Sequence, residues 1–135
     1  MGGASVEDGV VDPVQVWAVR LGNPESESKG RLALEDDALV FRLSEGELRL
    51  PLADIRKARR IRGSPVLTVD VEENARPVRF AFYFVEPPPL QPKGRESKGR
   101  ARRRGTGYLA MAAPRYKGLI QEWERAIREA VARQG

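Results

Sequence analysis

Basic side chains have the clearest chemical use in this sequence, because they gather in two stretches. In the first, residues 93–104, seven basic side chains are opposed by one acidic side chain, Glu96, which gives a net charge of +6. Its members are Lys93, Arg95, Lys98, Arg100, Arg102, Arg103 and Arg104. The second stretch follows Asp54 and consists of Arg56, Lys57, Arg59, Arg60 and Arg62. Such density predicts anion binding, to an acidic membrane or to nucleic acid, with the first stretch as the main site.

Residues for catalysis are scarce. The chain contains no histidine and no cysteine, so the commonest general base, thiol nucleophiles and zinc–thiolate sites are excluded. The carboxylates of Glu35, Asp36 and Asp37 could hold a hard cation, but they lack the spacing of a calcium loop and suit a hairpin turn better. We predict no enzyme, no metal site and no cofactor, while carboxylate or serine chemistry remains open.

Charge and composition divide the chain unevenly. The 135 residues carry a net charge of +5, so the chain outside 93–104 is close to neutral. Prolines and glycines surround the basic stretch, which predicts a long mobile loop at about 86–106. We expect a flexible N-terminus at 1–12 and one domain at 13–133. The longest apolar run has six residues, 80–85, against roughly 20 for a membrane span. We expect a cytoplasmic protein, free or peripheral at the inner face of the membrane.

Alternating apolar and polar residues predict short β-strands. The predicted runs are 14–21, 31–35, 39–44, 47–52, 67–71, 78–84 and, beyond the basic loop, 107–112. The apolar stripe of the first run changes parity after Val16, which predicts a β-bulge. Pro51 places the fourth run at a sheet edge or ends it there. Apolar residues are spaced by three in 55–61, which fits either a helical turn or an edge strand.

A C-terminal helix is the clearest predicted element. Its apolar residues recur at spacings of three and four over 114–133, with Trp123 at the centre and Pro114 suited to the first position. This stripe is wide enough to require burial, so the helix should close the open end of a curled sheet. Trp123 and Trp17 are both predicted to lie in the core.

The sequence resembles the pleckstrin-homology-like (PH-like) superfold, in particular its bacterial and GRAM-like members. The resemblance rests on the hairpin at 30–41, on the segment Leu50-Pro-Leu-Ala-Asp-Ile55 and on a final helix with a central Trp123. It implies a mainly β fold, in which seven antiparallel strands form a strongly bent, partly open barrel that the C-terminal helix caps. Members of this superfold bind lipid headgroups, peptides or other proteins.

Members that bind phosphoinositides commonly carry basic residues on the first strand and in the loop after it. Here that loop, predicted at 22–30, contains Glu25 and Glu27 against Lys29 alone. We therefore expect anion binding at 56–62 or 93–104 instead of at the usual pocket.

Two classes of function follow. The leading prediction is a noncatalytic binding or adaptor module for a protein partner or an anionic membrane surface, with no small-molecule substrate. The alternative is an RNA- or DNA-binding accessory protein that uses the basic segment 93–104 as its arm. Aromatic residues, which single-strand binders interleave with basic ones, are absent from that segment.

Overall fold

Seven strands and one long helix make up most of the described chain. The computed structural model describes residues 11–87 and 95–134, and for 24, 25 and 95–108 it describes the backbone alone. The elements are β1 (Val14–Arg20), β2 (Asn23–Leu34), β3 (Ala38–Leu43), β4 (Gly46–Pro51), a 3₁₀ turn η1 (Leu52–Asp54), β5 (Ile55–Arg60), β6 (Val66–Glu73), β7 (Arg76–Tyr83) and α2 (Arg95–Gln134).

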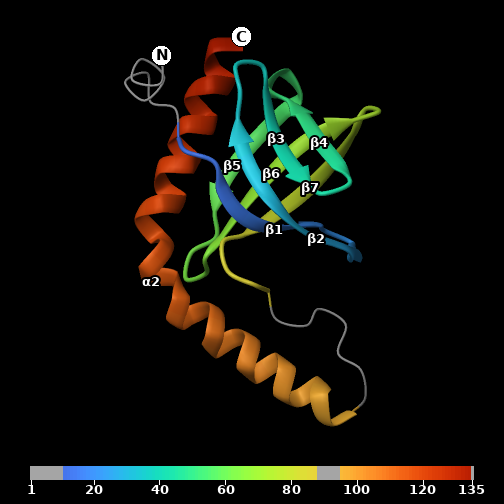
Figure 1. Ribbon diagram of the computed structural model, residues 1–135, viewed down its shortest axis with the longest axis vertical. Helices are drawn as coiled ribbons and strands as arrows, with labels where there is room; N and C mark the ends of the chain where they lie inside the picture. Colours follow the sequence, from blue (N-terminus) through green and yellow to red (C-terminus); the bar gives the residue numbers. More distant parts are fainter. Residues whose placement is uncertain (1–10, 88–94, 135) are drawn as a thin grey trace.

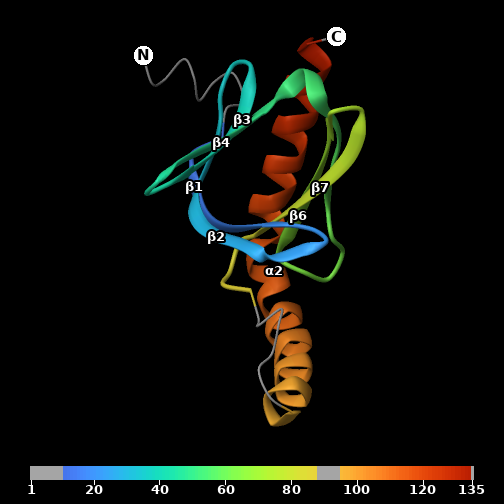
Figure 2. The same ribbon diagram turned by 90° about the vertical axis from the view of Figure 1, so that its right-hand side faces the viewer.

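The strands form one bent antiparallel sheet in the order β4-β3-β2-β1-β7-β6-β5. The sheet curls around a core, and the C-terminal half of α2 packs along it while the N-terminal half projects beyond the strands (Figures 1 and 2). Strands β4 and β5 are the two edges of the sheet, so the barrel is not closed. The predicted mainly β fold with one C-terminal helix is confirmed, and it is the architecture that the PH-like resemblance implies.

Aromatic and aliphatic side chains from both the sheet and α2 fill the core. Trp123 and Phe82 are fully buried, and Phe82 lies between Phe41 and Phe80 with ring centroids 6.1 and 6.5 Å away. The predicted burial of Trp123 is confirmed. The prediction for Trp17 is wrong, because this ring lies on the outer face of β1, where it is half-buried with the Lys29 ammonium 5.7 Å from its centroid.

Strand β2 begins earlier than the sequence predicts. The expected loop at 22–30 is a strand from Asn23, and Gly22 makes the turn with a left-handed φ of 91°. Cross-strand pairing with β1 explains the difference, since Val16 to Ala18 lie opposite Gly30 to Ser28. The Ser26 hydroxyl also accepts a hydrogen bond from the Arg20 amide at 2.8 Å. A polar segment that gains a full ladder needs no apolar alternation to form a strand.

Two irregularities explain the unclear patterns. The β1–β2 register shifts between Ala18 and Arg20, so the first strand has the predicted irregularity, but further along than the parity change after Val16 that predicted it. On β5, the register shifts between Ile55 and Lys57, so Ile55 and Ala58 both point into the core although they are three residues apart. The edge strand predicted as one choice for this segment is confirmed. Strand β4 is the other edge and ends at Pro51, as predicted.

Helix α2 is twice as long as predicted. It begins at Arg95 rather than Pro114, so the strand expected at 107–112 and the loop expected through 106 are both wrong. The packed turns around Trp123 supply the nucleus, and adding residues to an existing helix is cheap. Arg, Lys, Glu and Ala propagate a helix well, whereas each glycine costs about 1 kcal/mol relative to Ala. Pro114 lies inside the helix and costs about 3 kcal/mol, through a lost hydrogen bond and a clash of its ring with the preceding turn.

The ends of the predicted domain are covered in part. Residues 1–10 of the expected N-terminal segment and 88–94 of the expected loop, Lys93 included, lie outside the described residues. Val11, at the start of the described chain, packs against the core. Within the described ranges, no helix is long and apolar enough to cross a bilayer.

Candidate anion-binding surface

The basic residues of the second stretch lie on and just after β5, and they differ in their partners. Arg56 is neutralised, because its Nε and Nη2 both donate to Glu72 Oε1 on β6, the Nε at 2.9 Å. The side chains of the other four make no ion pair with a described residue. These four are Lys57, Arg59, Arg60 and Arg62. Four of the five predicted residues therefore retain a charge that could serve an anion.

One carboxylate, that of Asp70 on β6, organises the outer face beside β5. Arg79 on β7 holds it with two hydrogen bonds, Nε to Oδ1 at 2.6 Å and Nη2 to Oδ2 at 3.1 Å. Those bonds, reinforced by the positive charges of Lys57 and Arg59, keep the Asp70 pKa below its usual value despite partial burial. Three cations thus surround one carboxylate, and the excess charge is positive.

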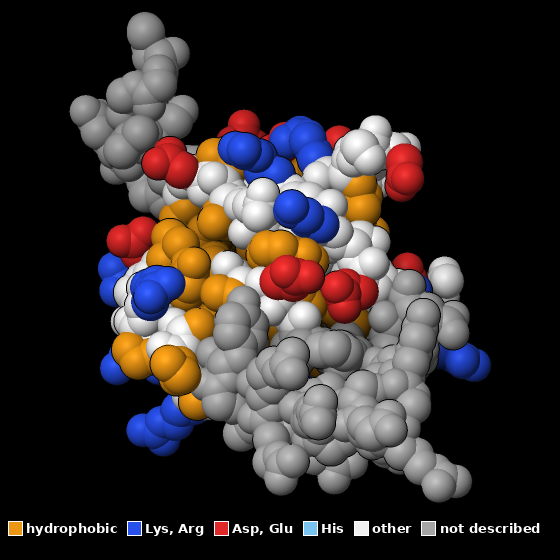
Figure 3. Space-filling model, turned by 60° about the horizontal axis from the view of Figure 1, so that its bottom comes forward, with side chains coloured by type: hydrophobic (Ala, Val, Ile, Leu, Met, Phe, Trp, Pro, Cys, Tyr) orange, Lys and Arg blue, Asp and Glu red, His pale blue; other side chains and the backbone are white. Residues whose placement is uncertain are grey.

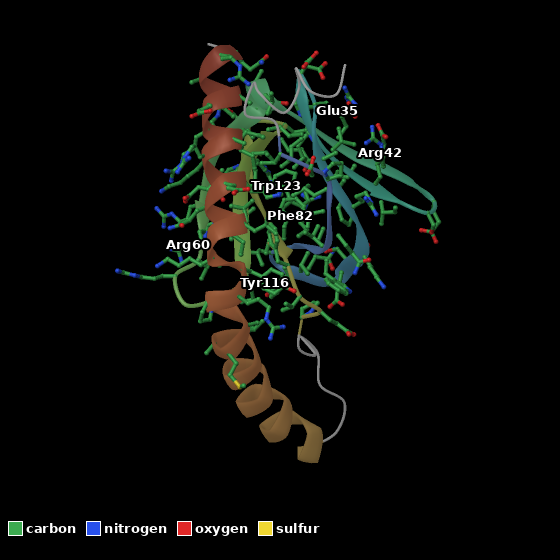
Figure 4. The ribbon with its side chains drawn as sticks, turned by 60° about the vertical axis from the view of Figure 1, so that its left-hand side comes forward. Glu35, Arg42, Arg60, Phe82, Tyr116 and Trp123 are labelled. Atoms are coloured by element: carbon green, nitrogen blue, oxygen red, sulfur yellow. The ribbon has the colours of Figure 1, made fainter. Side chains whose placement is uncertain are left out.

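Helix α2 closes the free edge of β5. The Arg60 amide donates to Glu124 Oε2 at 3.0 Å, and Arg128 Nε donates to the Ala58 carbonyl at 3.1 Å. Because the Ile61 amide donates to Val66 on β6, residues 58 and 60 are the ones whose backbone groups face away from the sheet. Glu124 and Arg128 also form an ion pair with each other at 3.3 Å. Their side chains therefore satisfy the backbone groups of β5 that a further strand would otherwise bond. Figure 4 shows Arg60 beside α2.

A hollow of about 180 Å³ lies between β5 and the C-terminal turns of α2. Its apolar lining comes from Ile55, Ala58, Ile127 and Val131. Its polar lining is entirely cationic and comes from Arg56, Lys57 and Arg128. This hollow brings part of the predicted basic stretch together with helix residues that sequence reasoning did not connect to it.

A second hollow of similar size opens between β1, β2, β3, β4 and β7. Its walls include Phe41, Leu43 and Phe80, with Ser26 and Ser28 at the polar side. The polar groups already have partners, since Ser26 donates to the Asn23 carbonyl and Ser28 to the Ser26 carbonyl. Arg20, also in the lining, is paired with Glu73 at 3.0 Å. The one described cation of this hollow is therefore committed within the protein.

The surface of β3 and β4 is electrically balanced. Arg42 pairs with Glu35 and with Glu47, while Arg49 donates to Glu35 at 3.2 Å and to Asp37 at 2.8 Å. The hydrogen bond from Arg42 holds the Glu35 pKa below its usual value. The turn predicted at 35–37 is confirmed, since it joins β2 to β3 with the Glu35 amide bonded to the Ala38 carbonyl. Two of its carboxylates, those of Glu35 and Asp37, pair with arginines.

The carboxylates of Glu27 on β2 and Glu86, shortly after β7, lie near each other. Burial and the nearby Glu86 raise the pKa of Glu27, and burial together with the charge of Glu27 raises the pKa of Tyr83.

On the face turned forward in Figure 3, hydrophobic side chains lie together, while Lys and Arg are scattered among Asp and Glu. The face in Figure 3 therefore carries no continuous basic patch among its described side chains. Among the described residues, no group of three or more His, Cys, Asp or Glu side chains could hold a metal ion.

The main predicted site, 93–104, is described only as backbone from Arg95 onward. This segment is the start of α2, on the half that projects beyond the strands (Figure 2). The C-terminal half of α2, by contrast, contacts β5, η1 and β6. The two predicted basic stretches are therefore carried by different parts of the molecule.

Sequence reasoning missed the contributions of Asp70, Arg79, Glu124 and Arg128. Only one signal for them was available, the i,i+4 spacing of Glu124 and Arg128 on the predicted helix, and that spacing by itself indicates a helix-surface ion pair. Which strand faces the helix depends on tertiary packing. The pairing of β6 with both β5 and β7 likewise places Asp70 between Lys57 on one strand and Arg79 on the other.

Comparison with known proteins adds little. No family model matches the sequence, and no curated protein matches it. Among solved structures, a chain described as "Critical structural role for the PH and C1 domains of the Vav1 exchange factor" is similar over 90% of the present chain, with 11% identity and a TM-score of 0.49. The present chain spans 25% of that one. The fold described above rests on strand order and register and not on this likeness.

Proposed function

We propose that the chain is a noncatalytic PH-like binding module, of the bacterial GRAM-like kind, that serves as an adaptor for a protein partner or an anionic membrane surface. One observation carries the proposal: the β5 edge retains Lys57, Arg59 and Arg62 without ion pairs to described residues, whereas Arg42 on β3 and Arg49 on the other edge strand, β4, are paired. Retained positive charge on a rigid strand is what an acidic partner requires. The proposed location is the cytoplasm, peripheral at the inner face of the membrane when bound.

A nucleic-acid function is the second candidate, and the projecting half of α2 favours it. This segment contains Arg95, Lys98, Arg100, Arg102, Arg103 and Arg104. A helix that extends beyond the barrel reaches phosphates without hindrance from the sheet (Figure 1). Lys93 completes the stretch in sequence. Changing the four arginines at 100–104 to serine tests whether this segment, rather than β5, dominates binding.

The test of the leading proposal compares two triple variants with equal charge change. The first replaces Lys57, Arg59 and Arg62 on the β5 side by serine. The control replaces Lys29, Arg31 and Arg76 by serine, three cations elsewhere on the sheet that make no ion pair with a described residue. Binding is measured by sedimentation with phosphatidylserine vesicles and by titration with an acidic peptide and an RNA, each at two salt concentrations.

The β5 variant should lose about tenfold or more in affinity for the vesicles or the acidic peptide, since each basic residue near an anionic membrane contributes about 1 kcal/mol. The control variant should lose clearly less. Equal losses in both variants would show that net charge alone matters and would contradict the proposal. Strong preference for RNA, with a salt slope that the 100–104 variant flattens, would favour the second candidate.

A further inference from the structure

The hollow between β5 and α2 combines two kinds of surface that a single ligand group rarely satisfies. Its floor is apolar, because Ile55, Ala58 and Ile127 are almost completely buried there and Val131 adds a half-buried wall. Its rim carries only positive charge, and none of the lining residues is acidic. The occupant that complements both surfaces is an apolar group with an anion attached to it.

The rim cations are held in place by bonds that leave donors unused. Arg56 is fixed by Glu72, and Arg128 is fixed by the Ala58 carbonyl and by Glu124. A guanidinium has five N–H donors, so each arginine can still donate to a ligand. The carboxylates of Glu72 and Glu124 offset two of the three rim charges, with that of Lys57 in excess. A singly charged group such as a carboxylate therefore matches the rim better than a polyphosphate does.

The size of the hollow limits the occupant further. At about 180 Å³ it is smaller than the roughly 300 Å³ at which pockets for whole small molecules begin. It has room for one side chain. We infer that the hollow binds the C-terminal residue of a protein partner, with the apolar side chain on the floor and the terminal carboxylate at Arg56, Lys57 and Arg128. The inference rests on the proposed function and specifies which chemical group of a protein partner binds beside residues 55–58 of β5.

Three short peptides test this inference on the full chain. The probe is acetyl-Gly-Ser-Leu with a free carboxylate, followed by amide chemical shifts of the labelled protein. One control peptide is the same sequence with an amidated C-terminus, which keeps the leucine and removes the charge. The other is acetyl-Gly-Ser-Gly with a free carboxylate. The probe should shift amides of 55–58 and 127–131 saturably, and each control should bind at least several-fold more weakly.

Two variants at the hollow and one control variant locate the site. Lys57→Gln should weaken the probe about twofold to fivefold, as expected for loss of an exposed charge pair, whereas Lys29→Gln, the same substitution on β2, should leave affinity unchanged. Val131→Phe should fill the hollow and abolish the shifts. If that variant fails to fold, the two lysine variants still decide the matter.

The outcomes separate this inference from the proposed function. Equal binding of the free and amidated peptides would overturn it, and so would shifts confined to other strands. If the chain binds phosphatidylserine vesicles but not the probe, the inference fails and the binding module stands. If the chain binds none of the three ligands, which are these vesicles, the acidic peptide and the probe, then the inference and the proposed function both fail.

Discussion

The two edges of the sheet both expose arginines, but they treat them differently. At the β4 edge, Arg42 and Arg49 lie within reach of three carboxylates and are paired with them. At the β5 edge, Glu72, Asp70 and Glu124 pair with Arg56, Arg79 and Arg128 instead, and the side chains of Arg59 and Arg62 have no ion pair with a described residue. Strand register contributes to the pairing at the β4 edge, because Arg42 on β3 lies directly opposite Glu47 on β4, whereas Arg59 on β5 lies opposite the uncharged Thr68.

The contrast shows that a count of basic residues does not identify an anion site. An arginine that faces a carboxylate in a cross-strand pair stabilises the sheet, and the carboxylate offsets its charge. Only an arginine without such a neighbour attracts an anionic ligand with its whole charge. The closing of the β5 edge by Glu124 and Arg128 adds a second feature, since that edge presents charge without presenting free backbone groups at Ala58 O and Arg60 N.

The largest effect should come from removing the anchor that keeps α2 on β5. Trp123→Ala leaves a large cavity in the core and should cost about 3–5 kcal/mol in chemical denaturation. Trp123→Phe should cost less, because the indole Nε1–H is buried without an acceptor among the described residues. Met111→Ala, on an exposed part of the same helix, serves as control and should stay within about 0.5 kcal/mol of wild type. Equal stability of Trp123→Ala and wild type would contradict the packing of α2.

A smaller effect should come from opening the β5 edge. Glu124→Ala leaves the Arg60 amide without its acceptor and should cost about 1 kcal/mol, since water replaces part of the lost bond. Hydrogen exchange at the Arg60 amide should accelerate. Glu122→Ala, an exposed position two residues earlier, should leave that exchange rate unchanged. An unaltered Arg60 rate in Glu124→Ala would show that the helix does not close the edge.

The Asp70 cluster should make stability depend on acid pH. Because the folded state lowers the Asp70 pKa below its usual 3.8, its contribution is complete above that pH and is lost as the pH falls through the lowered pKa. Asp70→Asn should therefore melt below wild type at neutral pH, and the gap should narrow in acid. Asp36→Asn, whose carboxylate makes no ion pair with a described residue, is the control. A constant gap for Asp70→Asn at all pH values would contradict the pairing with Arg79.

The smallest expected effect is a gain of binding at the balanced edge. The double variant Glu35→Gln, Glu47→Gln releases Arg42, leaves Arg49 with Asp37 as its remaining partner and should raise affinity for phosphatidylserine vesicles. The control double variant Asp36→Asn, Glu45→Gln makes the same charge change without releasing a described arginine. Equal gains in the two would mean that net charge, and not pairing, governs the surface.

Much of the fold was predictable, because apolar alternation marks strands whose inner face is buried. Phe80, Phe82 and Phe84 are buried as their spacing predicts. The start of β2 was not predictable in this way, since its polar residues are held by pairing with β1 rather than by burial. The first half of α2 is not visible in the sequence pattern, because its glycines and like charges disfavour a helix, and propagation from the packed C-terminal turns extends it nonetheless.

The candidate site was predictable only in its residue types. The run Arg56–Arg62 is visible in the sequence, but the partners that neutralise Arg56 or hold Arg128 come from elements far along the chain. A basic residue and its carboxylate lie 16 positions apart in the case of Arg56 and Glu72. No local pattern reports such pairs, because sheet topology creates them.

The central claim is that pairing, not arginine count, selects the anion-binding edge, and a short inorganic polyphosphate tests it most directly. Amide chemical shifts of the labelled protein are followed during titration at low salt. The account predicts the largest shifts among 57–62 and small shifts around Arg42 and Arg49. Shifts as large at those two arginines as on β5 would contradict it.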